Sequence, residues 1–431
     1  MKVLVVGTGG RDHAIAWKFT QSPRVSRVYV AHGNAGIAET AYCVNLKTIE
    51  EMADFAQKQR IDLTFVGPEK PLSAGIADLF ASYGLPIIGP GKRASRLESS
   101  KCDAKVIMRE LGIPVPEFEN FTEADKARDY IRSVGYPVVV KADGLAAGKG
   151  SLVCESVQEA EDAVRSIMEE RIFGDAGERV DIERRLYGRE LSFFCFTDGY
   201  TIIPMVAAQD YKRARENDEG KNTGGMGSYS PHPWLHDSLV QNIMSKVAEP
   251  LIRGVREKYD ILYRGILYLG LMLVESGTEV IPYVLEINIR LGDPEAQVIL
   301  PRLRTDLLDI SEAITTGRLD RIKPEWDSDY RLCLIAASGP TKGKKGWYKG
   351  YPDRYKIGLP IDGVDQIDKR CLVFHSGTEK NASGQLVTTG GRVLCIVSSG
   401  STLKEARETA LSEIAKVRFE GIYYRKDIGL E

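Results

Sequence analysis

Three polar residues alternate with apolar ones in LEINIRLGDPE, residues 285–295. Successive side chains of a strand point to opposite faces, so Glu286, Asn288 and Arg290 would project together into one site. A carboxylate and an amide oxygen two residues apart suit Mg²⁺, which usually takes one or two protein ligands beside phosphates. Arg290 could hold a carboxylate or an acyl phosphate bidentately, and the turn GDP places Asp293 just past the strand. The alternative is an edge strand with a solvated charged face.

Two lysines, Lys141 and Lys149, lie at the ends of the glycine-rich stretch KADGLAAGKG. A Walker A loop needs four residues between its glycines and a hydroxyl after its lysine. Here three residues separate Gly144 from Gly148, and Gly150 takes the hydroxyl position. The stretch is therefore not a P-loop. It predicts a β-hairpin flap whose lysines approach phosphates from different sides, or alternatively a flexible surface loop.

A glycine turn follows the first apolar run, where VLVVGTGGRDHAIAW places Gly9 and Gly10 between a predicted strand and a predicted helix. A dinucleotide fingerprint, G-x-G-x-x-G, would need glycine where Asp12 stands, so NAD binding is disfavoured. Two interpretations remain. One is a structural turn, and the other is a monophosphate or sugar site in which backbone N–H groups and Arg11 face an anion.

Two further loops follow predicted strands and would lie at the same edge of the sheet. HGNAG contributes Asn34, and VGPEKPL contributes Glu69. Ligands bind at the carboxyl edge of open α/β sheets, so Glu69 is a candidate partner for ribose hydroxyls. An exposed loop carboxylate is the alternative.

A long polar, glycine-rich stretch, AQDYKRARENDEGKNTGGMGSYSP, spans residues 208–231. Loops of this length inside compact domains are usually functional or disordered. Its TGGMG segment, which contains Gly224, allows close backbone approach. The side chains that could line a substrate pocket are Asp210, Lys212, Arg213 and Asn222.

The elements that must position these residues form three predicted regions of an α/β protein. Residues 1–100 alternate short β-branched runs with helix-like segments, which indicates a parallel sheet covered by helices. Residues 101–325 form a mixed region, in which 115–192 is a small lobe carrying the lysine–glycine stretch. Residues 326–431 resume the strands and then form a helix, which indicates a small α+β domain.

Capping patterns mark two of the predicted helices. Ser99 or Ser100 can cap a helix that ends at Gly112, and Thr402 with Glu405 forms a capping-box pattern.

Composition disfavours several classes of protein. The 431 residues are 43% apolar and 27% charged with a net charge of −2, which gives no general attraction to nucleic acid or anionic membranes. No apolar run approaches the roughly 20 residues of a membrane span, and no signal-peptide pattern is apparent. Seven scattered cysteines without a C-x-x-C pair disfavour a disulfide framework or zinc site and favour the cytoplasm.

Taken together, the motifs resemble those of the phosphoribosylamine–glycine ligases (glycinamide ribonucleotide synthetases), a family of the ATP-grasp superfamily. The resemblance rests on GTGGRDHA, GNAG, KADGLAAGKG, NTGGMG, GDPE, GGRVL and YYRKDIG, in this order along the chain. It implies an N-terminal parallel-sheet (pre-ATP-grasp) domain on the phosphoribosylamine side, a two-lobed ATP-grasp fold and a C-terminal α+β domain.

The resemblance also implies a reaction. ATP, glycine and 5-phosphoribosylamine would give glycinamide ribonucleotide, ADP and phosphate through glycyl phosphate, in de novo purine biosynthesis. Mg²⁺ or Mn²⁺ would be the metal. The expected protein is a cytoplasmic monomer with small-molecule substrates and without nucleic-acid or membrane partners.

Site residues follow from matching positions. Lys101 and Lys141 match the family's nucleotide-phosphate lysines, with the flap above them, and Glu183, Leu186 and Glu190 match its adenine–ribose strip. The other assignments are Gly148 and Lys149 for nucleotide binding; Glu286 and Asn288 as metal ligands; Arg290, Lys141 and Asp293 in catalysis; and Gly9, Gly10, Arg11, Asn34, Glu69, Asp210, Lys212, Asn222 and Gly224 for substrate binding.

The chain departs from the family pattern at several positions. Arg184, Arg185 and Arg189 are basic where acidic or apolar residues are usual, Asp12 replaces a glutamate, and Lys221 stands where proline is common. The arginines either form a solvated face of the strip or alter nucleotide affinity.

Two other functions are weighed against this ligase. One is a related ATP-grasp carboxylate–amine ligase that acts on a different acid or amine. The other, a degenerate ATP-binding regulator, is disfavoured because Lys101, Lys141, Glu286 and Asn288 are all retained.

Overall fold

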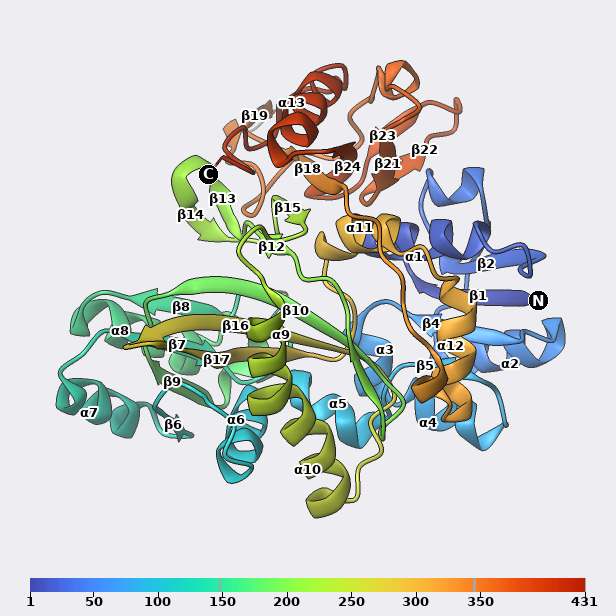
Figure 1. The fold of residues 1–431 in the computed structure, drawn as a ribbon. Helices are drawn as coiled ribbons and strands as arrows, with labels where there is room; N and C mark the ends of the chain where they lie inside the picture. Colours follow the sequence, from blue (N-terminus) through green and yellow to red (C-terminus); the bar gives the residue numbers. More distant parts are fainter. Residues whose placement is uncertain (147–148, 344–345, 431) are drawn as a thin grey trace.

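The computed structural model describes residues 1–146, 149–343 and 346–430. Its N-terminal sheet is wholly parallel, in the order β3-β2-β1-β4-β5 (Figure 1). Val3 and Val5 of β1 pack into one core beside α1, whereas Leu4 and Val6 pack into another beside α2 and α4. The predicted parallel α/β domain is thus confirmed. Its elements are β1 Lys2–Gly7, α1 Gly10–Thr20, β2 Arg27–His32, β3 Tyr42–Val44, α2 Ile49–Gln59, β4 Leu63–Val66, α3 Glu69–Ala74, α4 Ile76–Ser82 and β5 Ile87–Ile88.

Two consecutive helices, α5 Lys92–Ser99 and α6 Lys101–Glu110, lead into the central region. The Ser100 hydroxyl accepts a hydrogen bond from Asp103 N at 3.1 Å, so Ser100 is the N-cap that the sequence allowed. Because of this cap, helix α6 begins at Lys101.

A small lobe contains the antiparallel sheet β6-β9-β7-β8, and two helices pack on it (Figure 1). β7 and β8 are neighbours, with Lys141 opposite Ser151, so the predicted hairpin around the glycine-rich stretch is confirmed. The lobe has a buried core of its own, apart from the two larger ones. The elements are β6 Phe118–Phe121, α7 Ala124–Val134, β7 Val138–Ala142, β8 Ser151–Cys154, α8 Val157–Val164 and β9 Val180–Arg184.

A second antiparallel sheet, β11-β10-β16-β17, forms the body of the central region. It carries the predicted acidic strand at its edge, because β17 is the last strand in this order. The elements are β10 Arg189–Thr197, β11 Ile202–Pro204, α9 Asp237–Ile243, α10 Glu249–Tyr259, β16 Gly265–Ser276, β17 Glu279–Asn288, α11 Glu295–Ile299 and α12 Leu307–Thr316.

The C-terminal sheet takes two strands from the middle of the chain. Its order is β12-β15-β18-β24-β21, and β25 also pairs with β18. The Thr402 hydroxyl caps α13, as the sequence predicts. The elements are β12 Gln209–Asp210, β15 Gly227–Ser230, β18 Tyr330–Ser338, β21 Leu372–His375, β24 Arg392–Gly400, α13 Leu403–Ile414 and β25 Ile422–Tyr423, with the small hairpins β13 Arg213–Arg215 with β14 Glu219–Asn222, β19 Thr341–Gly343 with β20 Gly346–Tyr348, and β22 Thr378–Lys380 with β23 Leu386–Thr388.

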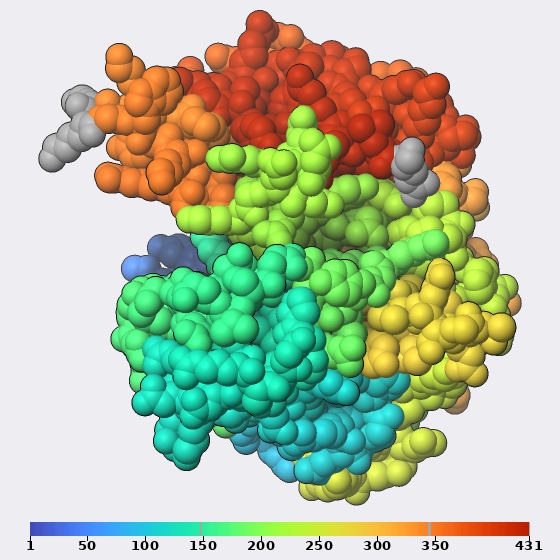
Figure 2. Space-filling view, turned by 90° about the vertical axis from the view of Figure 1, so that its left-hand side faces the viewer, coloured from blue at the N-terminus to red at the C-terminus, as the bar shows by residue number. Residues whose placement is uncertain are grey.

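The small lobe faces the C-terminal domain, and N-terminal residues are visible between the two in blue (Figure 2). None of the helices in the described part of the chain is long and apolar enough to cross a membrane. The domain boundaries at residues 100 and 325 stay predictions.

Candidate active site

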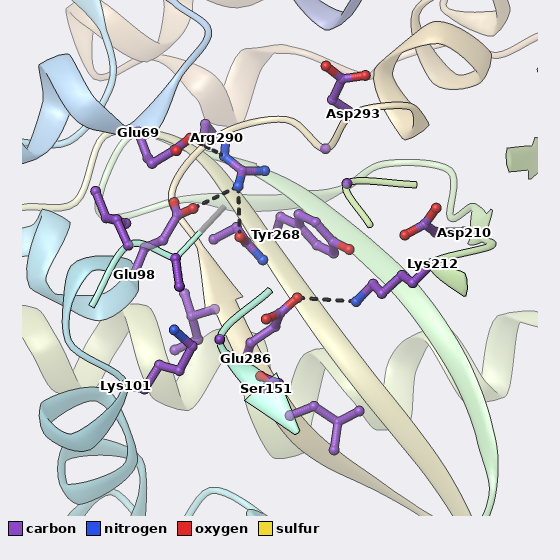
Figure 3. A pocket seen from close by; sticks show the side chains of 18 of the residues that line it. Glu69, Glu98, Lys101, Ser151, Asp210, Lys212, Tyr268, Glu286, Arg290 and Asp293 are labelled. Carbon is purple, nitrogen blue, oxygen red and sulfur yellow. Dashed lines mark hydrogen bonds and ion pairs between the residues drawn. The ribbon is translucent and has the colours of Figure 1, made fainter. Parts of the chain in front are cut away.

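A cavity of about 340 Å³ lies where the small lobe, the body sheet and the N-terminal domain meet. Its wall is strongly charged, and Figure 3 shows acidic and basic side chains converging on it from separate elements. Eleven of the predicted site residues line it: Arg11, Glu69, Lys101, Asp210, Lys212, Asn222, Gly224, Glu286, Asn288, Arg290 and Asp293.

Glu286 lies on β17 opposite Gly270 of β16. A Cβ at Gly270 would lie 3.0 Å from Glu286 Cγ, so the glycine leaves room for the carboxylate. Lys212 Nζ donates to Glu286 Oε1 at 3.2 Å (Figure 3). The ammonium of Lys212 holds the pKa of Glu286 at about 2, well below its ordinary value, so this carboxylate is ionised.

Arg290 lies just past the end of β17 and is hydrogen-bonded to several other residues of the chain. Its Nε donates to Glu69 at 3.3 Å, its Nη2 to Glu98 at 2.8 Å and to Asn288 Oδ1 at 3.0 Å, and its Nη1 to Leu291 O at 3.1 Å. Four of the five guanidinium N–H groups are therefore used. The sequence suggested that Arg290 could bind a carboxylate through two N–H groups. In the structure only one N–H has no chain partner, so that expectation is wrong.

Sequence reasoning missed Glu98, which lies on α5 and is buried. One of its oxygens accepts from Arg290, and the other accepts from Ile289 N at 2.8 Å. Glu98 therefore fixes both the end of β17 and the arginine beside it.

Lys101 lies on the lobe side of the cavity, whereas Lys141 is buried behind it and does not line it, so the role of Lys141 stays a prediction. Lys101 Nζ donates to Ala142 O and Gly144 O, at 3.3 and 2.9 Å. Lys141 Nζ donates to Glu183 at 2.6 Å and to Leu285 O at 2.9 Å. An ammonium has three N–H donors, so Lys101 keeps one for a ligand.

Glu183 is buried between two lysines and does not line the cavity. Lys105 Nζ lies 3.0 Å from its Oε1, beside Lys141. Burial lowers the pKa of Lys141, but the neighbouring carboxyl groups, Glu183 first among them, together raise it overall, so Lys141 is charged. Lys105 was missed, although its spacing of four residues from Lys101 on one helix was a usable signal.

Neither Leu186 nor Glu190 lines the cavity. Glu190 is exposed at the start of β10, and its charge contributes to raising the pKa of Lys212, after the larger effect of Glu286. The role of this strip in nucleotide binding stays a prediction, and Gly148 lies outside the described residues.

The N-terminal glycine turn encloses a carboxylate of the chain itself. Asp12 Oδ2 accepts hydrogen bonds from Thr8 N and Gly9 N, both at 2.8 Å. A Cβ at Gly7 or Gly67 would come within 2.1 or 1.8 Å of the Asp12 carboxylate. These N–H groups are therefore unavailable to a bound anion, which corrects that part of the phosphate-site interpretation.

Arg11 and the neighbouring glycines take different positions. Arg11 Nη1 donates to Leu291 O at 3.2 Å, so its side chain lies in the first cavity. A Cβ at Gly10 would lie 2.6 Å from Gln297 Nε2, so Gly10 serves helix packing and lines neither cavity.

A second cavity lies between the N-terminal and C-terminal domains. Gly9, Asn34 and Lys149 line it, with residues of the loops around β22 and β24. Lys149 Nζ donates to Pro352 O at 3.1 Å and lies here rather than in the first cavity. The Asn34 amide binds Thr8 O and His375 O, so it joins the two domains.

The two cavities adjoin at Asp293, Gly224 and Arg392, which line both. Arg392 Nη2 lies 3.2 Å from Asp293 Oδ2, and Arg392 Nη1 donates to the backbone oxygens of Asp293 and Gly224. Arg392 was missed as a site residue, although GGRVL is among the motifs. It holds the wall between the cavities.

Asp210, at the end of β12, lines the first cavity. Its Oδ1 is buried without a hydrogen-bond partner in the described part of the chain, and burial raises its pKa. Asn222 Nδ2 donates to Ser151 O at 3.4 Å, so this residue joins the long polar loop to the flap strand.

The departures from the family pattern lie outside both cavities. Arg184 stacks over Tyr136, Arg189 lies 3.8 Å from Glu275, and Arg185 pairs with Glu155. Lys221 Nζ lies 2.6 Å from Asp353 of the C-terminal domain. The solvated-face interpretation agrees with these contacts, whereas the effect on nucleotide use is untested.

Two antiparallel sheets that close on a polar cavity, one of them carrying a glycine-rich hairpin, are the arrangement of the ATP-grasp ligases, and this chain has that fold. Family models identify its branch of that class. The phosphoribosylglycinamide synthetase N domain matches residues 1–98, the ATP-grasp (A) domain 99–296 and the C domain 348–431. The chain belongs to the phosphoribosylglycinamide synthetase family.

Known proteins are similar over the full length. The phosphoribosylamine–glycine ligase of Caldanaerobacter subterraneus is 47% identical, covering 99% of both chains, and that of Halalkalibacterium halodurans is 45% identical, covering 100% of this chain and 96% of that protein. The crystal structure of the Thermotoga maritima enzyme has a TM-score of 0.84 at 31% identity, covering 99% of this chain and 100% of that one. A Hydrogenobacter thermophilus biotin carboxylase domain, at 17% identity and a TM-score of 0.71 over 98% of this chain and 91% of that one, shares the fold.

Proposed function

We propose that the chain ligates glycine to 5-phosphoribosylamine at the expense of ATP, giving glycinamide ribonucleotide, ADP and phosphate in de novo purine biosynthesis. The observation that carries the proposal is the pair of adjoining cavities. One presents the cations and carboxylates that phosphoryl transfer needs. The other, between the N-terminal and C-terminal domains, would hold the amine substrate. That the chain acts as a monomer stays a prediction.

The first cavity would bind ATP and activate glycine. Glycine's carboxylate does not react with an amine until it is converted to glycyl phosphate. Lys101, which lines this cavity and keeps one N–H donor, would meet the transferring phosphoryl group, and Lys141, buried behind the wall, would add its positive charge. The remaining N–H of Arg290 would bind the acyl phosphate. The glycine-rich flap would exclude water from that labile intermediate.

Glu286 and Asn288 suit a magnesium ion carried with the nucleotide. Glu286 is ionised, and Asn288 Oδ1 keeps a lone pair beside the one that Arg290 occupies. The described residues include no group of three or more His, Cys, Asp or Glu that could hold a metal alone, which agrees with an ion held partly by phosphates. Bound there, Mg²⁺ would neutralise charge on the phosphoryl oxygens. Mn²⁺ has the same ligand preference.

The second cavity would bind 5-phosphoribosylamine and present its amine across the Asp293–Arg392 wall. Asp293 faces both cavities, and the Arg392 guanidinium and Gln297 amide hold it in place. The amine then attacks the acyl carbon, and phosphate leaves. No covalent bond to the enzyme is needed.

The full chain should release ADP when given Mg-ATP, glycine and phosphoribosylamine made in situ from ribose 5-phosphate and ammonia. ADP release should require glycine, and mass spectrometry should detect glycinamide ribonucleotide. Absence of glycine-dependent turnover would contradict the proposal. Turnover restored by alanine or serine in place of glycine would instead favour a related carboxylate–amine ligase.

A Lys149→Met variant tests whether Lys149 serves the second cavity rather than the first. We expect its KM for phosphoribosylamine to rise about tenfold or more, because a hydrogen bond to a charged group contributes about 1.5–3 kcal/mol, while its KM for ATP changes less than about twofold. The matched control is Lys342→Met, which removes an exposed lysine of β19 outside both cavities. A raised KM for ATP alone would restore the original assignment of Lys149 to the nucleotide.

A further inference from the structure

Asp181 is a buried carboxyl group with no assigned role, at the centre of the small lobe's sheet. It lies on β9 opposite Asn120 of β6 and Lys141 of β7, and its exposed fraction is 0%. Directly opposed residues in an antiparallel sheet share a face, so Asp181, Asn120 and Lys141 point the same way. That face meets α6, because Asn120 Nδ2 donates to Cys102 O at 3.4 Å.

No described group donates a hydrogen bond to either carboxyl oxygen of Asp181, and Asn120 Oδ1 is also buried without a partner. An ionised carboxylate in this position would lack the donors that normally offset the cost of burial. Glu183, two residues further along β9, lies on the same face of the strand, so its carboxyl group is the neighbour of Asp181 there. Two carboxylates are both acceptors, so the two groups form a hydrogen bond only if one of them carries a proton.

Glu183 is the carboxylate with cationic partners. Lys141 Nζ lies 2.6 Å and Lys105 Nζ 3.0 Å from its Oε1. Two ammonium groups favour the ionised form of Glu183. The proton between the two carboxyl groups therefore belongs on Asp181.

We propose that Asp181 is a protonated carboxylic acid that donates its hydrogen bond to Glu183, and thereby positions Glu183 as the single negative charge between Lys105 and Lys141. The directions of the pKa shifts agree. Burial raises the pKa of Asp181 well above its ordinary value, whereas the two lysines bring that of Glu183 to about 2.

The neutral state of Asp181 determines the charge of the nucleotide side of the cavity. The charged and titratable groups around it are Cys102 and Lys105 from α6, Lys141 from β7 and Glu183 from β9. With Asp181 neutral, two ammonium groups face one carboxylate, and one positive charge remains for phosphate. An ionised Asp181 would cancel that charge. This consequence rests on the proposed ATP site, but the protonation itself does not.

Asp181→Asn tests the protonation without an activity assay. In the unfolded chain Asp181 ionises above a pKa of about 4, whereas in the native protein it keeps its proton. The native state thus binds one more proton, so wild-type stability should fall with rising pH relative to the variant. Between pH 5 and 8 the ratio of the two unfolding constants should change about tenfold per pH unit. A pH-independent ratio would overturn the proposal.

Infrared difference spectra of native wild type against the variant give a second readout that does not depend on reversible unfolding. At neutral pH we expect a carboxylic-acid carbonyl band that the variant lacks. A carboxylate band in its place would show an ionised Asp181 and overturn the proposal.

The matched control is Asp103→Asn on α6. Asp103 lies 2.9 Å from Arg179, and hydrogen bonding to that guanidinium lowers its pKa against the effect of burial. Its removal should shift stability by the same amount at every pH from 5 to 8, and no carboxylic-acid band should disappear.

A positioning role also predicts kinetics. Asparagine can donate to Glu183 as the acid does, so Asp181→Asn should keep the KM for ATP within about twofold of wild type. Asp181→Leu lacks the donor, and its KM for ATP should rise while kcat changes less. A KM that rises about tenfold in Asp181→Asn would show that a negative charge is needed there, contrary to the proposal.

Discussion

A Glu286→Gln variant is expected to fold normally and to lose ATP-dependent ligation, with kcat reduced on the order of 10³-fold or more. The amide keeps the size of the side chain and can still accept a hydrogen bond from Lys212. It lacks the charge that holds a metal ion, and a metal contributes several kcal/mol to stabilising phosphoryl transfer. ADP release measured at saturating ATP and glycine would report the loss directly.

The matched control for this variant lies on the same strand. Glu279→Gln changes an exposed glutamate at the other end of β17, where its partner is Lys246 at 3.3 Å. It should keep wild-type activity. Full activity in Glu286→Gln would remove Glu286 from the proposed metal site.

An Arg290→Met variant should lose both stability and activity. The change leaves Glu98 without its guanidinium partner, and the Glu98 side chain is only 7% exposed. Breaking a buried ion pair by removing one partner costs about 3–5 kcal/mol. Denaturant unfolding should show that loss, and kcat should fall roughly 10²–10³-fold if the remaining N–H binds the acyl phosphate.

The double variant Glu98→Gln with Arg290→Met separates the two roles of the arginine. Glutamine removes the unpaired charge and can still accept from Ile289 N, so much of the stability should return. Activity should stay low. If activity recovered together with stability, Arg290 would be a structural residue that holds β17 and would have no part in catalysis.

Much of the fold was predictable because local patterns specify it. β-Branched runs separated by helices identified the parallel sheet, and the Ser100 and Thr402 hydroxyls cap helices where their sequence patterns placed them. Alternating polarity brought Glu286 and Asn288 to one face of β17. These features depend on neighbours within a few residues, which a single sequence displays.

The missing parts of the site depend on distant partners. Nothing near Glu98 in the sequence shows that Arg290, 192 positions away, will use most of its donors on chain acceptors. The turn containing Gly9 has the composition of an anion site, yet Asp12 supplies the anion. Lys149 follows a nucleotide-flap pattern but reaches the C-terminal domain, which only tertiary packing decides.

The strand order of the C-terminal sheet has a consequence for dissecting this protein. β15, from the middle of the chain, lies between β12 and β18, with Gly227 opposite Leu334 and Ser230 opposite Arg331. A recombinant fragment ending near residue 325 would lack β18 and leave the backbone of β15 unpaired along one side. Such open edges recruit strands from other molecules. The fragment should therefore precipitate or self-associate. We expect that truncation at the predicted domain boundary near residue 325 does not give a soluble catalytic fragment.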